Sequence, residues 1–350
     1  MNIVLYLFLS FFSLTACKKQ ERYTFPPPVP QPQPQTSRPA SIGIVGDSAD
    51  VQTSTRGGVV IMGGSTDVDA AFAWMLERSG GGDVVIIRAT GTDAYNPYVN
   101  KLGKANSVET LKIDSRQLAD DAGVARIIRN AEMLFIAGGD QSNYTKFWKD
   151  TKVMDAINYL LKEKKVPVGG TSAGAAVLGH YYFTGEKASV TSASALANPF
   201  GEDITLYNGG FLQAPYLENV ITDQHFSQRE RQGRTIVFLG RIMKDWGKAP
   251  YGIAVDEKTA VCIDDAGMAQ VVGENQAFFI STEPAKTPET FLVNQPVTWN
   301  RDGKALKVSA ISGKAKGNQF NVRTFEPAST IGLKNYWWSV VAGKFLFTDN

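Results

Sequence analysis

Short apolar runs alternate with longer amphipathic segments along the first half of the chain. Apolar and β-branched residues predict strands buried on both faces at 57–64, 83–89, 107–114, 131–139 and 165–172. Between them, apolar residues recur at helical spacing and predict helices at 67–80, 121–131 and 152–165. This alternation predicts an α/β fold with a doubly wound, mostly parallel sheet, because right-handed crossovers pack helices on both faces. In such sheets, ligands bind beyond the carboxyl ends of the strands.

After about residue 254 the pattern changes to strand-like runs separated by turn residues. These runs predict an antiparallel β-rich portion with strands at 259–265, 269–274, 276–282 and 289–294. The aromatic alternation at 335–347 predicts a terminal strand or hairpin. We therefore expect an α/β core at 57–270 and a β-rich C-terminal extension at 271–350.

The N-terminal residues have the pattern of an export signal. An apolar run too short for a membrane span leads to small residues and Cys17, and "LTAC" resembles a bacterial lipobox. We expect a lipoprotein signal peptide at 1–17, with Cys17 lipidated; a short uncleaved anchor is the alternative. Both interpretations export the protein, to the periplasm or the cell surface. Prolines between 23 and 40 predict an extended spacer, so 18–56 is expected to be a linker that tethers the folded part to a membrane.

Composition excludes several classes of function. The 36 Lys and Arg residues nearly balance 34 Asp and Glu residues, so no net field favours nucleic acid. The chain has two cysteines, Cys17 and Cys262, and two histidines, which are too few for a zinc cluster. Once Cys17 is lipidated, Cys262 has no disulfide partner, and its alternating strand context predicts a buried apolar role. We expect neither a metal nor an organic cofactor.

Ser172 is a candidate nucleophile. It stands in Gly170-Thr171-Ser172-Ala173-Gly174, a G-x-S-x-G sequence at the predicted passage from a strand to a helix. Flanking glycines relieve crowding in a tight turn, and the Ala173 amide is placed to help bind an oxyanion. The same sequence also fits an ordinary glycine-rich turn, so the motif alone leaves catalysis open.

A catalytic serine needs a base, and two histidines are available. His180 follows Ser172 by eight residues; on a continuous helix it would lie about 12 Å away along the axis, beyond hydrogen-bond reach. His225 follows an apolar strand-like run, which places it at a strand end near the serine. A structural histidine is the alternative for His225.

Acidic and basic residues cluster around His225. Asp223, Arg229, Arg231 and Arg234 lie within a dozen residues, with Arg231 and Arg234 at a spacing that shares one helical face. Arginines bind carboxylates in a bidentate manner, so this cluster indicates an acidic group on the substrate. A solvated basic helix is the alternative.

Four motifs in the same order resemble the cyanophycinase branch of the S51 serine peptidase family, which is related to aspartyl dipeptidases (dipeptidase E). They are "IAGGDQSNY", "GGTSAGA", "TDQHFSQRERQGR" and "GIAVDEKTA", and the resemblance extends from about residue 57 to about residue 270. It implies a flavodoxin-like sheet, similar to that of class I glutamine amidotransferases. It also implies serine-type exopeptidase chemistry without a cofactor, and leaves a homodimer open.

The resemblance also implies roles for individual residues. Ser172 corresponds to the nucleophile, His225 to the base and Glu257 to the acid, with Asp256 as the weaker candidate for the acid. Gly139 corresponds to the glycine whose amide shares the oxyanion hole with Ala173. The residues implied to bind substrate are Gln141, Asp223, Gln224, Arg229, Arg231 and Arg234.

The implied substrate is cyanophycin, an aspartate backbone whose side chains are amide-linked to arginines. An exopeptidase of this family releases β-aspartyl-arginine from the chain end through an acyl-enzyme on the serine. Two alternatives stay open. One is a dipeptidase for aspartyl or isoaspartyl peptides, and the other is a surface-tethered binding protein without turnover, which would have no evident need for Ser172, His225 and Glu257 together.

Overall fold

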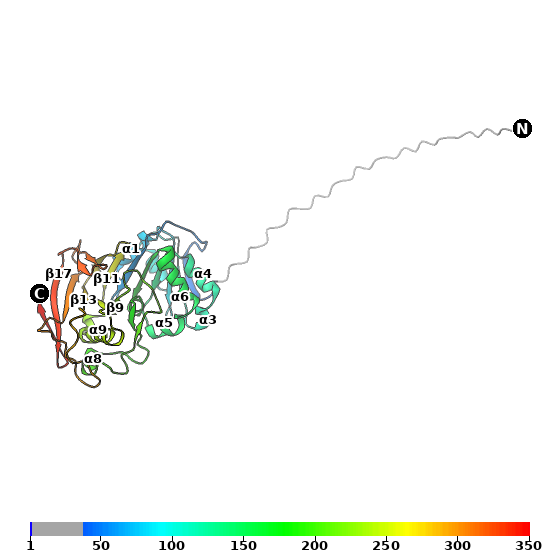
Figure 1. The fold of residues 1–350 in the computed structure, drawn as a ribbon. Helices are drawn as coiled ribbons and strands as arrows, with labels where there is room; N and C mark the ends of the chain where they lie inside the picture. Colours follow the sequence, from blue (N-terminus) through cyan, green and yellow to red (C-terminus); the bar gives the residue numbers. More distant parts are fainter. Residues whose placement is uncertain (2–37) are drawn as a thin grey trace. The chain divides into compact units, whose positions relative to one another are not determined.

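The larger of two sheets has ten strands in the computed structural model, which describes Met1 and residues 38–350 (Figure 1). Its order is β1-β4-β3-β5-β6-β2-β11-β12-β15-β16. The five strands from β4 to β2 are mutually parallel, whereas β1 and the strands from β11 onward are antiparallel to their neighbours. The bounds are β1 (Ser41–Gly46), β2 (Gly58–Met62), β3 (Asp83–Arg88), β4 (Ser107–Lys112), β5 (Met133–Ile136), β6 (Pro167–Thr171), β11 (Thr259–Asp264), β12 (Met268–Gly273), β15 (Phe320–Asn321) and β16 (Glu326–Pro327).

The second sheet of the described part has eight strands in the order β18-β17-β14-β13-β10-β9-β7-β8. It is mainly antiparallel, but β9 runs parallel to β10 and to β7. The carboxyl ends of β9 and β10 therefore meet at one edge. The bounds are β7 (Tyr181–Phe183), β8 (Leu206–Asn208), β9 (Val220–Gln224), β10 (Tyr251–Val255), β13 (Gln276–Ser281), β14 (Leu306–Ser312), β17 (Leu333–Val341) and β18 (Lys344–Asp349).

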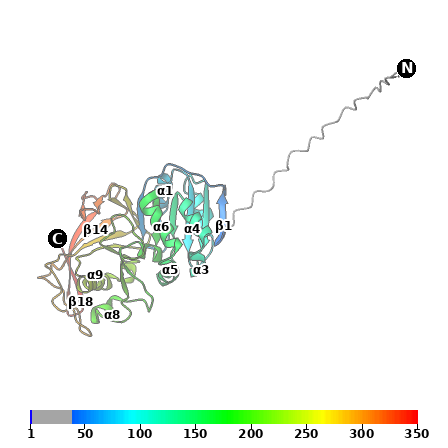
Figure 2. The same cartoon turned by 45° about the vertical axis from the view of Figure 1, so that its right-hand side comes forward.

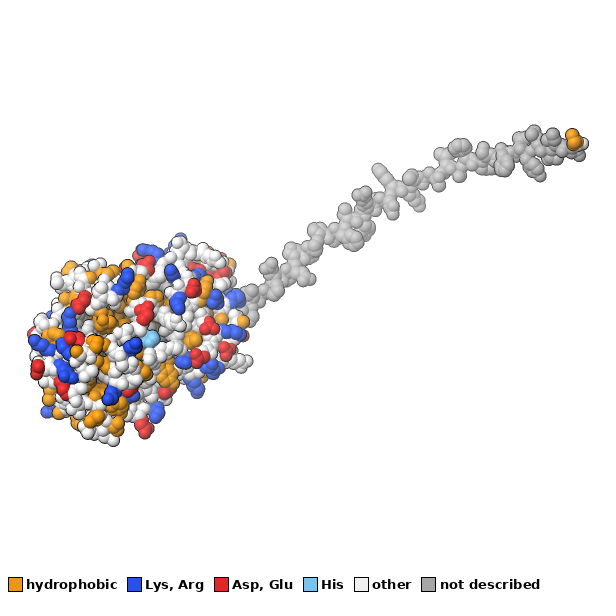
Figure 3. All heavy atoms as spheres, in the orientation of Figure 1, with side chains coloured by type: hydrophobic (Ala, Val, Ile, Leu, Met, Phe, Trp, Pro, Cys, Tyr) orange, Lys and Arg blue, Asp and Glu red, His pale blue; other side chains and the backbone are white. Residues whose placement is uncertain are grey.

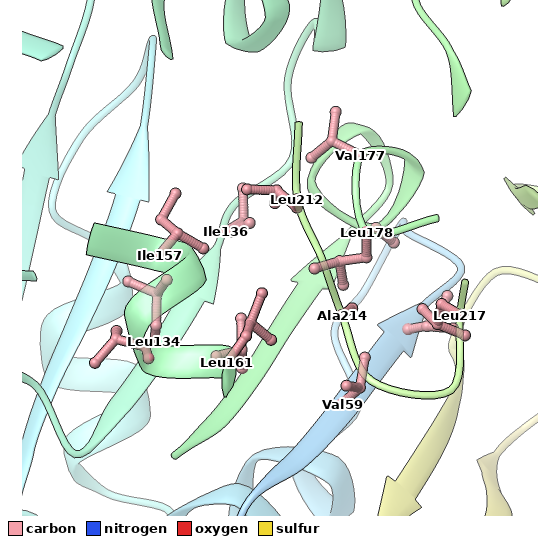
Figure 4. Packing of buried hydrophobic residues seen from close by; sticks show 14 of the residues in the cluster. Val59, Leu134, Ile136, Ile157, Leu161, Val177, Leu178, Leu212, Ala214 and Leu217 are labelled. Atoms are coloured by element: carbon pink, nitrogen blue, oxygen red, sulfur yellow. The ribbon is translucent and has the colours of Figure 1, made fainter. Parts of the chain in front are cut away.

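Helices cover both faces of the parallel strands. One face packs against α1 and α2 and the other against α4 and α6, because alternate residues of each strand point to opposite sides. Figure 4 shows Ile157 and Leu161 packed near Leu134 and Ile136 of β5. The bounds are α1 (Asp69–Arg78), α2 (Tyr95–Asn100), α3 (Arg116–Ala119), α4 (Ala122–Asn130), α5 (Gln141–Trp148), α6 (Lys152–Tyr159), the π-helical turn η1 (Leu160–Lys164), α7 (Ala173–Ala176), α8 (Ser192–Ala197), the 3₁₀ turn η2 (Ser227–Arg229) and α9 (Gln232–Trp246).

The predicted α/β fold is confirmed, with the five predicted parallel strands and the three predicted helices present. The predicted strand at 289–294 is wrong. Only Thr290 forms a bridge there, with Thr298, and Leu292 and Val293 are exposed rather than buried in a sheet. The tail does form the predicted hairpin, β17 and β18.

Two predicted boundaries differ from the arrangement of the strands. β1, labelled in Figure 2, lies inside the range 18–56 that the sequence predicts as linker. It forms a strand because its short apolar run pairs with β4. The division at residue 270 does not separate the two sheets, because β13 from the predicted extension pairs with β10 from the predicted core. The predicted signal peptide, Cys17 and the proline-rich part of the linker lie outside the described residues.

Candidate active site

Ser172 lies in the sharp turn between β6 and α7. Its backbone has φ 51° and ψ −118°, a conformation that a non-glycine residue rarely adopts. The flanking glycines have no room for a side chain: a Cβ at Gly174 would lie 2.1 Å from the Ile136 carbonyl oxygen, and one at Gly170 2.4 Å from the Gly174 backbone. This packing holds the turn in place. The geometry is that of a nucleophile elbow, which raises the serine side chain above the strand ends.

His225, just after β9 of the second sheet, meets Ser172, just after β6 of the first sheet. Its Nε2 lies 2.8 Å from the Ser172 Oγ, and its backbone amide donates to the Gly63 carbonyl oxygen at 2.8 Å. Gly64 makes this approach possible, because a Cβ there would lie 2.5 Å from the His225 Nε2 and 3.1 Å from the Ser172 Cβ. The imidazole is only 9% exposed. It is therefore fixed in a position from which it can accept the serine proton.

Glu257 orients the imidazole from the other side. The His225 Nδ1 lies 2.7 Å from the Glu257 Oε1, and both residues follow the neighbouring parallel strands β9 and β10. Because Gln224 and Val255 are opposite each other in this register, the residues beyond the two strand ends come together. Asp256 points elsewhere, and its carboxylate accepts from the backbone amides of Ser227 at 2.8 Å and Gln276 at 3.3 Å.

The electrostatics favour a neutral imidazole. Burial lowers the pKa of His225 below its ordinary value, the Glu257 carboxylate opposes this shift, and the guanidiniums of Arg229 and Arg231 reinforce it. The pKa of Glu257 is lowered as well, mainly because it accepts the hydrogen bond from His225. A neutral base beside an ionised carboxylate suits proton abstraction from a serine.

Two backbone amides are placed for an oxyanion. Ala173 is the first residue of α7, so its N–H has no intrahelical partner. Gly139 follows β5, which is the parallel neighbour of β6, and has φ +156°. Both residues line the same cavity as Ser172. Their role as an oxyanion hole remains a prediction.

The catalytic cavity has a volume of about 400 Å³ and is mostly polar. All the residues predicted to bind substrate line it, which brings together segments from β5, β6, β9 and α9. These residues are Gln141, Asp223, Gln224, Arg229, Arg231 and Arg234. Sequence reasoning missed Asp140 and Lys187, which also line the cavity. Asp140 stands inside the "GGDQ" motif, so its place next to Gly139 was a usable signal.

The three arginines of the predicted cluster differ in burial and in partners. Arg234 is buried and holds Asp223: its Nε donates to the carboxylate at 2.9 Å, and its terminal nitrogen makes a second contact. Burial alone would raise the pKa of Asp223, but the Arg234 charge lowers it below its ordinary value. Arg231 donates to the Gln224 carbonyl oxygen at 2.7 Å and more weakly to Asp223 at 3.4 Å, and burial lowers its pKa to about 10. Arg229 is exposed and faces the cavity.

A larger cavity of about 850 Å³ lies away from this chemistry. Val59 and Val166, near the starts of β2 and β6, line it, so it opens at the end of the sheet opposite to Ser172. His180 also lines this cavity, with its Nε2 2.9 Å from the Asn208 Oδ1. α7 ends at Ala176, so the continuous helix considered for His180 is absent, but this histidine still lies apart from the serine. The smaller, polar cavity is therefore the candidate active site.

Other features of the described residues add little to this site. No group of three histidine, cysteine or acidic side chains within residues 38–350 is arranged to hold a metal ion. Burial raises the pKa of Cys262 in β11 to about 12, as expected for an inert thiol. No helix in the described part is long and apolar enough to cross a membrane. Charges of both signs are interspersed on the face drawn in Figure 3.

A serine, a histidine and a carboxylate connected in this order define a site of the serine-hydrolase type. Residues 59–271 match the family model described as peptidase family S51. The chain belongs to this family.

Its relatives include cyanophycinases. The one from Trichormus variabilis is 30% identical over 196 residues, which are 55% of this chain and 60% of that protein. The chain therefore spans less than two thirds of that relative's length. The cyanophycinase from Geminocystis herdmanii is 25% identical over 288 residues, covering 79% of this chain and 97% of that protein. A crystal structure of a peptidase from an acI-B1 actinobacterium has a TM-score of 0.48 at 17% identity, covering 65% of this chain and 91% of that one.

Proposed function

We propose that the protein is a serine exopeptidase that releases β-aspartyl-arginine from cyanophycin through an acyl-enzyme on Ser172. The observation that carries the proposal is the continuous chain of contacts from the Ser172 Oγ to His225 at 2.8 Å and from His225 to Glu257 at 2.7 Å. Relatives named cyanophycinase support the choice of substrate.

The reaction has two steps, acylation of Ser172 and hydrolysis of the resulting ester. His225 Nε2 accepts the hydroxyl proton as the Ser172 Oγ attacks the scissile carbonyl carbon, and the amides of Gly139 and Ala173 bind the oxyanion. The carbon–nitrogen bond then breaks, and His225 gives the proton to the leaving amine. Water, deprotonated by His225, next attacks the ester carbonyl. The ester bond breaks, the proton returns to the Ser172 oxygen, and the free acid leaves.

The proposed product determines which bond must be cleaved. Release of the dipeptide requires hydrolysis of a peptide bond in the aspartate backbone, while hydrolysis of the isopeptide bond would release free arginine. Arg229 is the exposed cation that would bind the free carboxylate of the repeating unit, with Arg231 beside it. Arg234 is held by Asp223 through two contacts, whereas Arg231 reaches the same carboxylate only at 3.4 Å. The polar cavity suits a substrate that carries both charges.

The location of the protein is a further part of the proposal. Export as a lipoprotein, with the lipid on Cys17 and the proline-rich segment as a tether, rests on the sequence of residues outside the described part. An exported, tethered enzyme would digest polymer at the periplasmic or outer side of a membrane. A homodimer rests on the family resemblance.

The test uses the full chain, purified cyanophycin granules and separation of the soluble products by chromatography and mass spectrometry. We expect β-aspartyl-arginine from the wild type and none from Ser172→Ala. Free arginine as the first product would contradict cleavage of the backbone. Inert granules combined with hydrolysis of small aspartyl or isoaspartyl dipeptides would replace the proposal with a dipeptidase. Binding of the granules without any product would indicate a binding protein.

A further inference from the structure

Two carboxylates line the catalytic cavity, and their surroundings differ. Asp223 is 2% exposed, and both of its oxygens are engaged by Arg234, with further contacts from Thr235, the Gln224 amide and, at 3.4 Å, Arg231. This carboxylate has no capacity left for a ligand. Asp140 is exposed to the cavity, and within residues 38–350 no cation forms an ion pair with it. The site therefore presents one carboxylate that is available to a ligand.

The position of Asp140 is fixed by the fold. It follows β5 directly after Gly139 and caps the start of α5, where one carboxylate oxygen accepts from the Ser142 amide at 2.9 Å. An N-cap uses only one of the lone-pair positions of an ionised carboxylate. The second oxygen has no protein partner among the described residues. The N-cap hydrogen bond thus holds the Asp140 carboxylate at the cavity without neutralising its charge.

Cations lie on the other side of the nucleophile. Ser172 follows β6, whose parallel neighbour β5 leads to Asp140, whereas His225 and the arginines Arg229 and Arg231 follow β9 of the second sheet. The His225 contact to Ser172 connects the two sides. The reacting hydroxyl therefore lies between the Asp140 carboxylate, carried by the segment after β5, and the guanidiniums of the segment after β9. Lys187, which also lines the cavity, forms an ion pair with Glu202 at 3.6 Å. A ligand that bears a cation and a carboxylate on separate arms matches this arrangement.

We propose that Asp140 binds the guanidinium of the substrate's arginine, while Arg229 and Arg231 bind a carboxylate of the same unit. The inference rests on the proposed hydrolysis of arginine-bearing aspartyl polymer and adds a residue that determines specificity. A carboxylate accepts a planar guanidinium through charge-assisted hydrogen bonds, which are about twice as strong as neutral ones.

The neighbouring oxyanion hole gives Asp140 a second effect on selectivity. An unpaired negative charge next to the Gly139 amide opposes the negative charge that develops on the substrate oxygen. A bound guanidinium neutralises Asp140 and removes this opposition. A substrate with a neutral side arm leaves the charge in place. Selection for arginine is therefore expected in kcat as well as in KM.

The test compares two soluble trimers of the repeating unit, one with arginine and one with citrulline. Citrulline has a urea group of the same shape as the guanidinium but without charge. The variant is Asp140→Asn in the full chain, because asparagine is an equally good N-cap and keeps α5 intact. The matched control is Asp121→Asn. Asp121 caps α4 through the amides of Gly123 and Val124 and does not line the cavity.

We expect the wild type and Asp121→Asn to prefer the arginine trimer in kcat/KM by about 10- to 100-fold. Asp140→Asn should reduce this preference to less than threefold, chiefly by slowing the arginine trimer. An unchanged preference in Asp140→Asn would overturn the role of Asp140.

Binding of both trimers to Ser172→Ala, with and without Asp140→Asn, separates this inference from hydrolysis. If Ser172→Ala binds the arginine trimer more tightly than the citrulline trimer, and Asp140→Asn removes this difference, the inference is supported. This holds even if the wild type cleaves neither trimer, a result that would refute only the proposed hydrolysis. Equal binding of the two trimers to Ser172→Ala would contradict guanidinium recognition.

Discussion

Asp256 and Glu257 are adjacent in the sequence, yet their carboxylates bind different partners. Glu257 lies 2.7 Å from the His225 Nδ1, while Asp256 accepts backbone amides at 2.8 and 3.3 Å. Successive side chains at a strand end point in opposite directions, so only one of the two can face the histidine. Asp256 instead fixes the segment after His225 through the Ser227 amide. Glu257 therefore orients the imidazole of His225, while Asp256 holds the backbone that follows it.

Glu257→Gln should impair turnover much more than stability. The amide cannot stabilise the imidazolium that forms when His225 accepts the serine proton, so kcat should fall about 10³- to 10⁴-fold. Steady-state kinetics and a thermal melt measure the two effects. Asp256→Asn is the comparison: it should lower the free energy of unfolding by about 1–3 kcal/mol because two partly buried amides lose a charged acceptor. A kcat loss in Asp256→Asn as large as that in Glu257→Gln would contradict the assignment.

Gly64→Ala should abolish activity while leaving most of the fold intact. The new Cβ would meet the His225 Nε2 at 2.5 Å and the Ser172 Cβ at 3.1 Å, so the imidazole must move away from the hydroxyl. We expect a kcat/KM loss of about 100-fold or more, because a displacement of about 1 Å has that effect. Gly247→Ala is the control, since Gly247 also has a positive φ of +64° but nothing within 4 Å. It should cost only about 1 kcal/mol of stability. Equal activity in the two variants would refute the close approach.

Much of this site could be predicted from the sequence. The G-x-S-x-G turn indicated Ser172, and the shortage of histidines left His225 as the base within reach. Glu257 needed the family resemblance, because periodicity alone does not distinguish it from Asp256. Gly64 could not be predicted, since its role depends on how far apart His225 and Ser172 lie in space.

The parts of the fold that sequence reasoning missed depend on tertiary pairing. The sequence predicts β1 as part of a linker because a short apolar run shows nothing of its partner, β4. The run at 289–294 has the pattern of a strand, but Leu292 and Val293 lie at the surface. The sequence predicts that all three arginines after His225 are available to substrate. Only the structure shows that Asp223 pairs with Arg234 and, at 3.4 Å, with Arg231.

The activity should fall as the pH drops through a pKa below the ordinary 6.5 of histidine. Burial and the nearby guanidiniums disfavour the imidazolium, so the neutral base persists to lower pH. The profile of kcat/KM against pH measures this value in the free enzyme. With two histidines in the chain, NMR titration gives it independently once His180→Gln assigns the two signals.

Removing one guanidinium tests the cause of this shift. Arg229→Gln should raise the pKa of His225, whereas Arg241→Gln, which removes an arginine paired with Asp245 on α9, should leave it unchanged. A His225 pKa above 6.5 in the wild type would contradict the account.

Arg234→Met should destabilise the protein strongly. It leaves the Asp223 carboxylate buried without its main cation, and breaking a buried pair costs about 3–5 kcal/mol. Arg241→Met, which breaks a partly exposed pair on the same helix, should cost less than about 1 kcal/mol. Urea denaturation measures both free energies of unfolding. A small loss in Arg234→Met would indicate that Asp223 is stabilised by its other partners alone.

The most direct test of the account is to locate the reactive nucleophile. The full chain is treated with a fluorophosphonate, which forms a stable bond with activated serines, and the labelled peptide is identified by mass spectrometry. We predict a single label on Ser172, formed at least about 100-fold more slowly in His225→Gln. A label on another residue, or equal labelling of Ser172 without His225, would contradict the proposed nucleophile and its activation.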